Sequence, residues 1–454
     1  MTTKRTIDIH TFPPNADSYG LNGPAYEGNL RRGELRGIIK INQDRCVGCD
    51  TCRKFCPTNA IQGGLGAKHH IEDNSCVYCG QCLLACPFNA IEQMSFIEKV
   101  EEALADKDLI CVAQPSPSVR VSICEEFGAE PGELSTAQIV YALEALGFTV
   151  YDCNNAADQT IIEEASEFVK KVRYWVLGER GPEVDMVAEH PFPHFTSCCP
   201  AWVKNAETFH AGILPHLSTA RSPIQMGGPV AKTWTAKYVF KCDPRKIFFV
   251  SVTPCTAKIF EAARPEMNAA WRWAVKHGVI PPDAPSYQDV DASLTARDIA
   301  VMMKKHGINP LDMPKEKKRG VLEIYTGGGT IFGCSGGVME AAVRTAYFQL
   351  AGRELENADV KTVRGLDNEI VEATIPIPVK ALGGKIVEVR VCVVNGAARG
   401  LNTVIDRVQR DKNRYHFVEV MNCPGGCVNG GGQPVQPVGT AWLNPALPLP
   451  LRVS

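Results

Sequence analysis

The chain has 454 residues, of which 45% are hydrophobic and 22% charged, and its formal net charge at pH 7 is -2. This length exceeds what one hydrophobic core usually serves, so two or three domains are expected. The small net charge argues against a nucleic-acid partner. We find neither an apolar run long enough to span a bilayer nor the apolar segment of a signal peptide. These features predict a cytoplasmic protein, or a periplasmic one exported with a partner that carries the signal.

Residues 1–35 are polar and rich in glycine and proline, and we expect an extended arm or docking segment there. The chain has 19 cysteines. Because this count is odd and the chain is long, reduced thiols are expected rather than a disulfide framework.

Two cysteine runs with the same spacing, Cys-x2-Cys-x2-Cys-x3-Cys-Pro, lie within residues 36–95. Their members are Cys46, Cys49, Cys52 and Cys56, then Cys76, Cys79, Cys82 and Cys86. This is the spacing of a bacterial ferredoxin with two [4Fe–4S] clusters, in which each run gives three thiolates to one cluster and a fourth to its neighbour. Each half is predicted to form a strand, a cluster loop, a short helix and a strand. The chain is therefore expected to transfer electrons.

A larger α/β domain is expected over residues 96–436. Residues 109–113, 148–151 and 246–252 read as strands, and residues 135–146 as an amphipathic helix capped by Ser135. Strands that alternate with helices predict two mostly parallel sheets, in which ligands lie beyond the carboxyl ends of strands. Cys255 follows a predicted strand in that way.

Five further cysteines lie in three unusual loops of this domain. Residues 195–202 hold Cys198 and Cys199, residues 252–258 hold Cys255, and the glycine-rich residues 419–434 hold Cys423 and Cys427. Glycine allows the backbone to approach a bulky group closely. Four of these thiols would suffice for one more cubane, with Cys198 a spare thiol able to carry protons. Each loop alone could equally be a zinc site or a tight turn, but the three together favour a further iron–sulfur site.

The three loops resemble the signature loops of [FeFe]-hydrogenases, TSCCPxW, xPCxxKxxE and ExMxCPGGCxxGGGQP. Residues 116–120, 161–167 and 326–340 also fit, so the resemblance covers roughly residues 36–436. It implies the large, catalytic subunit of the type with two ferredoxin clusters, and reversible formation of H2 from two protons and two electrons. It also implies an H-cluster, which is a cubane joined through a cysteine sulfur to a two-iron unit with CO, CN⁻ and a dithiolate bridge.

The resemblance also implies roles for individual residues. The cubane would be held by Cys199, Cys255, Cys423 and Cys427, the last shared with the two-iron unit. Cyanide ligands would be met by Lys258 and by the segment Ser116, Pro117 and Ser118. An apolar wall would be formed by Phe332, Gly333 and Met421. Protons would pass through Cys198, Glu164, Ser218 and Glu167. A solvated helix face is the alternative for the two glutamates, which are three residues apart.

Two departures from the family pattern stand out. Thr253 replaces the methionine of many relatives, and we expect its hydroxyl near the two-iron unit to shift potential, oxygen tolerance or catalytic bias.

The apolar, proline-rich tail at residues 437–454 is expected to dock on a partner. That partner would be a separate small subunit, or ferredoxin-like and formate dehydrogenase subunits.

The remaining motifs give milder expectations. Cysteines outside cluster spacing are expected in the core; these are Cys111, Cys124, Cys153, Cys242, Cys334 and Cys392. His69 and His70 are expected in a solvated turn.

The alternatives to a hydrogenase are an H2-sensing or non-catalytic relative, and a ferredoxin-like carrier with a degenerate catalytic domain.

Overall fold

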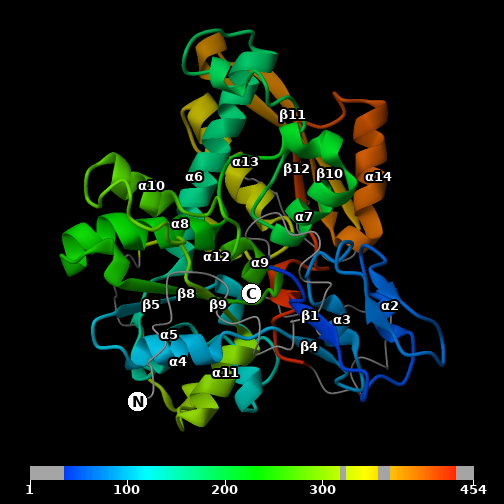
Figure 1. Cartoon of the computed structure of the whole chain (residues 1–454). Coiled ribbons are helices and arrows are strands. Elements are labelled where there is room, and N and C mark those ends of the chain that lie inside the picture. The colour runs from blue at the N-terminus through cyan, green and yellow to red at the C-terminus, as the bar shows by residue number, and fades with distance from the viewer. Residues whose placement is uncertain (1–34, 317–323, 356–368, 436–454) are drawn as a thin grey trace.

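The computed structural model describes residues 35–316, 324–355 and 369–435 (Figure 1). The predicted N-terminal arm, apart from Leu35, and the predicted tail at residues 437–454 lie outside the described residues. In the described part of the chain, no helix is long and apolar enough to cross a lipid bilayer.

The ferredoxin-like repeat folds as two matching halves. The first contains β1 (Ile39–Ile41), α2 (Thr51–Lys54) and β2 (Ile61–Gln62), and the second contains β3 (His70–Ile71), α3 (Gln81–Ala85) and β4 (Ile91–Gln93). β1 pairs antiparallel with β4, and β2 pairs antiparallel with β3, so the two ends of the repeat are tied together. The predicted order of strand, cluster loop, helix and strand is confirmed in both halves.

The first sheet of the larger region is parallel throughout, in the order β6-β5-β8-β9. Its strands are β5 (Ile110–Pro115), β6 (Thr149–Val150), β8 (Ile247–Thr253) and β9 (Ala292–Thr295). Every residue of β8 is buried, as expected for a parallel strand covered on both faces. Helices α4 (Ile97–Ala105), α5 (Thr136–Ala145) and α11 (Ala296–Lys305) lie below this sheet in Figure 1, and α6 (Cys153–Lys171) and α8 (Pro223–Val230) lie above it. The strands predicted from sequence are confirmed.

The helix predicted at residues 135–146 is also present, but its expected cap is not. The Ser135 side chain makes no capping bond to α5. Its hydroxyl instead donates to the carbonyl of Arg120 at 2.8 Å. A carbonyl of the loop at residues 116–122 thus takes the hydrogen bond of the Ser135 hydroxyl. The cap prediction is wrong, although the helix boundary is right.

The second sheet is mixed, in the order β10-β11-β12-β7. β10 (Ile370–Val379) pairs antiparallel with β11 (Lys385–Asn395), while β12 (Phe417–Met421) is parallel both to β11 and to the short β7 (His194–Phe195). α13 (Gly337–Ala351) and α6 pack their apolar faces against this sheet. α6 therefore contributes to both halves of the larger domain, as Figure 1 shows.

The other α-helices are α7 (Pro200–Phe209), α9 (Ala257–Ala262), α10 (Ala269–Lys276), α12 (Gly327–Ile331) and α14 (Ala397–Arg410). The 3-10 segments are η2 (Pro117–Val119), η3 (Ile123–Phe127), η5 (Asp185–Val187), η6 (Ala211–His216), η8 (Pro244–Lys246), η9 (Pro310–Asp312), η11 (Lys380–Leu382) and η12 (Cys427–Asn429). Two π-helical segments, η4 (Val172–Val176) and η7 (Ala231–Phe240), extend α6 and α8.

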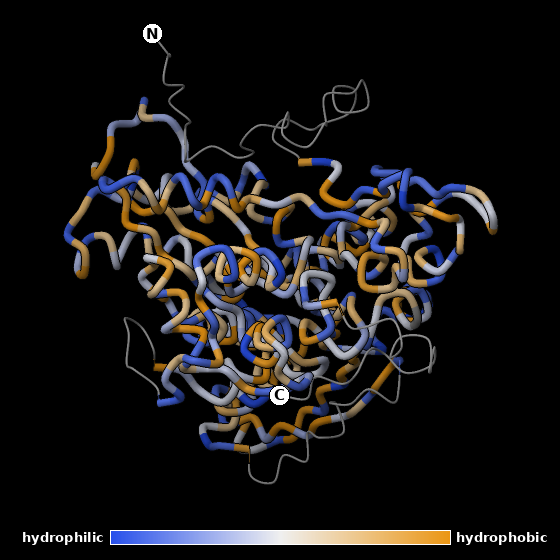
Figure 2. Tube along the Cα trace, turned by 90° about the horizontal axis from the view of Figure 1, so that it is seen from below, coloured by the Kyte–Doolittle hydropathy of each residue, from blue (hydrophilic) through white to orange (hydrophobic). Residues whose placement is uncertain are grey.

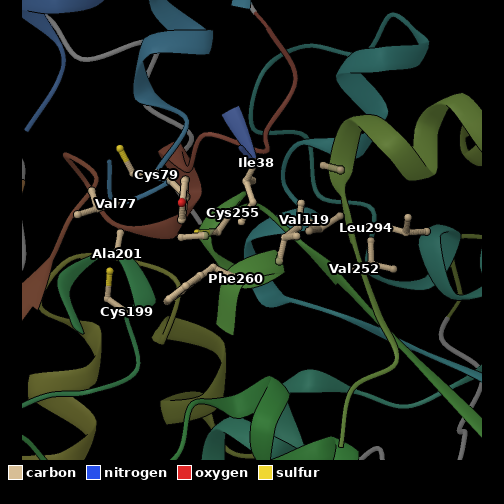
Figure 3. Close-up of a cluster of buried hydrophobic side chains, with 14 of the residues drawn as sticks. Ile38, Val77, Cys79, Val119, Cys199, Ala201, Val252, Cys255, Phe260 and Leu294 are labelled. Atoms are coloured by element: carbon tan, nitrogen blue, oxygen red, sulfur yellow. The ribbon is translucent and has the colours of Figure 1, made fainter. Parts of the chain in front are cut away.

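One hydrophobic core joins the repeat to the larger domain. Ile38, Val77 and Cys79 of the repeat belong to the same buried cluster as Cys255 and Phe260, and Figure 3 shows this junction. Figure 2 shows hydrophobic and hydrophilic residues interleaved along the described elements, as expected for elements with one buried face. Among the cysteines expected in the core, Cys111, Cys124, Cys153 and Cys392 are buried, whereas Cys242 and Cys334 are partly exposed.

Candidate active site

Each half of the ferredoxin-like repeat contributes thiols to both of two small cavities. One cavity is lined by Cys46, Cys49, Cys52 and Cys86, and the other by Cys56, Cys76, Cys79 and Cys82. Each cavity thus receives three thiols from one run and one from the other. The backbone nitrogen of Ala60 donates to Cys56 Sγ at 3.2 Å, and that of Ala90 donates to Cys86 Sγ at 3.3 Å. These two bonds, to Cys56 and to Cys86, occupy equivalent places in the two halves.

His69 lies against the first of these cavities, so the prediction of a solvated turn is wrong for this residue. Its side chain is 1% exposed, and its Nε2 lies 2.9 Å from Asp50 Oδ1. Its backbone nitrogen donates to Cys46 Sγ at 3.4 Å. Burial lowers the pKa of His69, but Asp50 and Cys46 outweigh that effect, so the pKa lies above its usual value. His70 is exposed as predicted, but it lies in β3 and not in a turn.

The three cysteine loops of the larger domain converge where its sheets end. Cys199 precedes α7, Cys255 follows β8, and Cys423 and Cys427 follow β12. Burial raises the pKa of the Cys423 thiol well above its usual value, and the nearby Cys79, Cys255, Cys199 and Cys427 raise it further. Burial likewise raises the pKa of Cys255 to about 12. Three of the four thiols are buried and Cys427 is partly buried. Neighbouring thiols that oppose one another's ionisation become thiolates only around a cationic group, so this donor set fits an iron–sulfur cubane.

A single metal ion fits these thiols less well. Within the described residues, no three His, Cys, Asp or Glu side chains converge closely enough to hold one ion. A cubane keeps its thiolates farther apart than a zinc ion does, because each sulfur binds a different iron.

The glycines of the last loop bring backbone against backbone. A Cβ on Gly430 would lie 2.2 Å from the Pro254 carbonyl oxygen, and one on Gly431 would lie 2.1 Å from the Cys79 carbonyl oxygen. The close approach expected from glycine is present, but its partners are the Cys255 loop and the second ferredoxin loop. These contacts fix the distance between the second ferredoxin cavity and the thiols of the larger domain.

The side chains expected to form an apolar wall surround Cys198 and Cys427. Cys198, Phe332 and Met421 belong to one buried cluster, and Cys427 packs against it. Gly333 lies on Ser118, since a Cβ on the glycine would be 2.2 Å from the Ser118 hydroxyl. That hydroxyl is buried and has no hydrogen-bond partner in the described structure, so it is available to a ligand.

The loops after β5 and β8 are held together. The backbone nitrogen of Ser116 donates to the Val252 carbonyl at 2.9 Å, and Pro117 begins η2. The Thr253 hydroxyl donates to the Cys255 carbonyl at 2.9 Å and accepts from the Cys255 nitrogen at 3.2 Å. The hydroxyl is therefore engaged by the Cys255 backbone, a partner that the sequence did not indicate.

Lys258 is a buried cation beside Cys198. Its Nζ donates to the Cys198 carbonyl at 3.0 Å and to the Glu261 carboxylate at 3.0 and 3.2 Å. Burial lowers the pKa of Lys258, but Glu261 and the nearby thiols outweigh it and hold the pKa above its usual value. The lysine is thus a fixed positive charge, and Glu261 is a partner that sequence reasoning missed.

The two glutamates of the expected proton path are buried on α6, which excludes the solvated-face alternative. Ser218 Oγ donates to Glu167 Oε2 at 3.3 Å, and the Thr219 nitrogen and hydroxyl each donate to the same oxygen at 2.8 Å. Burial raises the pKa of Glu164 to about 8, and Glu167 and Glu419 add to that rise. Glu164 therefore holds a proton at neutral pH.

Two charged or titratable neighbours of these glutamates were missed. Lys171 Nζ lies 3.3 Å from Glu167 Oε1, and His194 Nε2 lies 3.3 Å from Glu164 Oε1. Lys171 follows Glu167 by four residues, a spacing that does place two side chains on one helix face. His194 had no comparable signal, because only the pairing of β7 with β12 brings it over α6.

A two-cavity ferredoxin repeat joined to a buried thiol site, with carboxyl groups alongside, defines an iron–sulfur oxidoreductase. The 4Fe-4S dicluster domain family matches residues 38–101, and the family described as iron only hydrogenase large subunit, C-terminal domain, matches residues 109–431. The chain belongs to the iron-only hydrogenase large subunit family.

Relatives and solved structures agree with this assignment. The chain is 43% identical to the periplasmic [Fe] hydrogenase large subunit of Nitratidesulfovibrio vulgaris, over 95% of this chain and 90% of that protein. It is 34% identical to the NADP-reducing hydrogenase subunit HndD of Solidesulfovibrio fructosivorans, over 92% of this chain and 69% of that protein. A variant of [FeFe]-hydrogenase HydA1 from Chlamydomonas reinhardtii superposes with a TM-score of 0.61 at 30% identity, covering 76% of this chain and 85% of that one.

These findings confirm the predicted fold class, enzyme class and cofactors. The protein is an iron hydrogenase that interconverts H2 with protons and electrons at an H-cluster, and it relays electrons through two [4Fe–4S] clusters.

Proposed function

We propose that H2 turnover takes place at the buried site between the two sheets, with Cys199, Cys255, Cys423 and Cys427 as the cubane ligands. When bound there, the H-cluster supplies the redox chemistry that joins two protons and two electrons. The observation that carries this proposal is the convergence of four thiols from three distant loops beside Cys198 and Lys258. The catalytic domain then extends over residues 96–436 and the ferredoxin-like domain over residues 36–95.

The chain's own residues have distinct tasks in this proposal. Lys258 presents a fixed positive charge to anionic ligands of the two-iron unit, and the free Ser118 hydroxyl offers a second donor. Phe332, Gly333 and Met421 exclude water from the site. Thr253 acts through the Cys255 backbone, which it holds by two hydrogen bonds.

Protons leave the site along α6. Cys198 exchanges a proton with the site, and Glu164, Ser218 and Glu167 carry it toward the surface. The high pKa of Glu164 supports this assignment, because a group that holds its proton near neutral pH can both give and take one.

Electrons leave on another side, through the ferredoxin-like domain. Cys79 lies close enough to Cys423 to raise the pKa of that thiol, and Gln81 Nε2 donates to the Asn429 carbonyl at 2.9 Å across the junction. The second ferredoxin cluster therefore takes electrons from the cubane, and the first passes them outward. Val47 and Phe88 line the first cavity and are exposed. The first ferredoxin cluster is therefore accessible to an electron-transfer partner.

The partner and the compartment complete the proposal. A separate small subunit, or ferredoxin-like and formate dehydrogenase subunits, would receive the electrons and contact the tail. The relative named as a subunit of an NADP-reducing hydrogenase supports a multi-subunit assembly. A cytoplasmic location stays a prediction, and the relative named as periplasmic supports the alternative of export with a signal-bearing partner.

Infrared spectroscopy tests the proposed function on protein produced anaerobically with the two-iron unit installed. We expect bands in the CO and CN⁻ stretching region that shift under H2. Bands that ignore H2 would instead support the sensing or non-catalytic alternative. The absence of bands, with iron near about eight atoms per chain, would leave only the two ferredoxin clusters and support the carrier alternative.

A further inference from the structure

His194 lies between the two glutamates of the proposed proton path. Its Nε2 is 3.3 Å from Glu164 Oε1, and its Nδ1 is 3.8 Å from Glu167 Oε1. The side chain is fully buried, and neither ring nitrogen has a hydrogen-bond partner of normal geometry in the described structure. The second distance exceeds that of a direct hydrogen bond, but such contacts often tighten only during turnover.

The two oxygens of Glu167 face different groups. Oε2 accepts from Ser218 and from Thr219, as described above. Oε1 faces Lys171 Nζ at 3.3 Å and the imidazole of His194 at 3.8 Å. Ser218 also lowers the pKa of Glu164, although neither Glu164 oxygen has a hydrogen-bond partner in the described structure. His194 and Ser218 thus lie beside the same pair of glutamates, and they face different oxygens of Glu167.

The surroundings keep His194 neutral. Burial lowers its pKa well below the usual value, and the charges of Lys171 and His190 lower it further. The groups that face it are Glu164, Glu167 and Lys171 on α6 and His190 before β7, with Glu419 on β12 acting on Glu164. The rings of Phe168 and Phe417, at 5.9 and 4.8 Å between centroids, fill the remaining space. A neutral imidazole has one donor and one acceptor nitrogen, so it can take a proton on one side and release one on the other.

We propose that His194 is a second, parallel branch of the proton relay, bridging Glu164 to Glu167 beside the Ser218 branch. This inference rests on the proposed proton path. In the outward step the Glu164 O–H bond breaks and an N–H bond forms at Nε2, while the Nδ1–H bond breaks and an O–H bond forms on Glu167. One proton moves and no electron is transferred. The step leaves the N–H bond at Nε2, so the ring must reorient in its pocket, with that hydrogen attached, before a second proton can follow.

The test compares four variants of the loaded holoenzyme: Glu164→Gln, Ser218→Ala, His194→Met and the double variant Ser218→Ala/His194→Met. Two readouts are used. The first is the rate of H2 evolution from a reduced viologen across pH. The second is the infrared carboxyl band of Glu164, titrated in protein that lacks the two-iron unit. His416→Gln serves as a histidine control, because His416 accepts from the Arg390 nitrogen at 3.0 Å and lies outside the relay.

We expect Glu164→Gln to lower the rate by about 10²–10⁴-fold, the usual contribution of a proton-transfer group. Each single bridge variant should lose about tenfold or less, and the double variant should fall to the level of Glu164→Gln. His194→Met should also displace the pH at which the Glu164 band titrates, because the imidazole lies 3.3 Å from Glu164 Oε1. The titration reports this contact, and the rates of the single and double variants report proton transfer.

The outcomes separate the branch from the path it rests on. If Glu164→Gln loses activity while His194→Met changes neither the rate nor the Glu164 titration, the branch is overturned and the path stands. If Ser218→Ala alone matches Glu164→Gln, the path has a single branch. If Glu164→Gln is fully active, the proposed path itself fails.

Discussion

Both the ferredoxin-like repeat and the catalytic site gather thiols, but over very different lengths of chain. The repeat draws eight cysteines from residues 46–86, whereas the thiols proposed to hold the cubane come from residues 199–427. In the repeat, loop spacing and short strand pairs place each thiol. In the catalytic site, two sheets, α6 and a glycine-rich loop must all be in position first. A local motif thus supports electron transfer, while the chemistry depends on the whole domain.

The largest expected effect comes from removing one of the thiols proposed to hold the cubane. Cys423→Ala should abolish H2 turnover, because the remaining three thiols cannot complete the cubane. Iron content should fall to about eight atoms per chain, the two ferredoxin clusters. Iron analysis and electron paramagnetic resonance of the reduced protein would measure this change.

The matched change in the repeat sharpens the comparison. Cys49→Ala should remove only the first ferredoxin cluster and leave H2-dependent infrared bands at the active site. Cys392→Ala, in the buried core of β11, should keep the full iron content. Loss of the H2-dependent bands in Cys49→Ala would show that the two regions do not assemble separately.

The pH dependence of proton delivery is the next largest effect. Glu164 has a pKa of about 8, so below that pH it is a neutral acid able to donate, and above it an anion. H2 evolution should therefore decline as pH rises through about 8, while H2 oxidation, which needs an acceptor, should not decline there. Rates measured in both directions on the same preparation test this prediction. A decline of equal size in both directions would place the titrating group elsewhere.

The junction between the regions should be sensitive to a single methyl group. Gly431→Ala would place a Cβ 2.1 Å from the Cys79 carbonyl oxygen and 2.5 Å from the Gly80 Cα, both backbone atoms. Overpacking of this kind costs about 1–3 kcal/mol, so the protein should unfold at a lower temperature. Electron transfer to the second ferredoxin cluster should also slow. Gly212→Ala is the control, because a Cβ added at that glycine would meet no atom within 4 Å. Equal stability of the two variants would contradict the tight junction.

The smallest expected effect is at the outer ferredoxin cluster. His69→Gln removes the imidazole beside Cys46 and Asp50, whose partners favour its positive form. Loss of a nearby positive charge disfavours the reduced cluster, so the midpoint potential should fall by up to about 59 mV, a tenfold change in the one-electron equilibrium. A redox titration monitored by electron paramagnetic resonance would detect the shift. His70→Gln, on the exposed neighbour, should leave the potential unchanged.

Much of this architecture could be predicted from sequence where the signal is local. The strands β5, β6 and β8 followed from apolar runs, and the crossed sharing of Cys56 and Cys86 followed from spacing. The structure brings the expected catalytic residues together, but their individual roles stay proposals.

What could not be predicted depends on contacts between distant segments. His194 reaches the glutamates because β7 pairs with Phe417 and Val418. Ser135 does not cap its helix, because its hydroxyl donates to the nearby carbonyl of Arg120. His69 is buried because the segment between the two cysteine runs folds back over Cys46 of the first run. In each case a partner far along the chain competes with the local pattern.

The crossed ligand sets also bear on how the protein matures. Cys56 belongs to the first run but lines the second cavity, and Cys86 does the reverse, so neither cavity is complete until both runs have folded together. The backbone of Cys79 also packs closely against Gly431 in the glycine-rich loop at residues 419–434. The two runs must therefore fold against each other before either ferredoxin cluster can bind, whichever of the two clusters is inserted first.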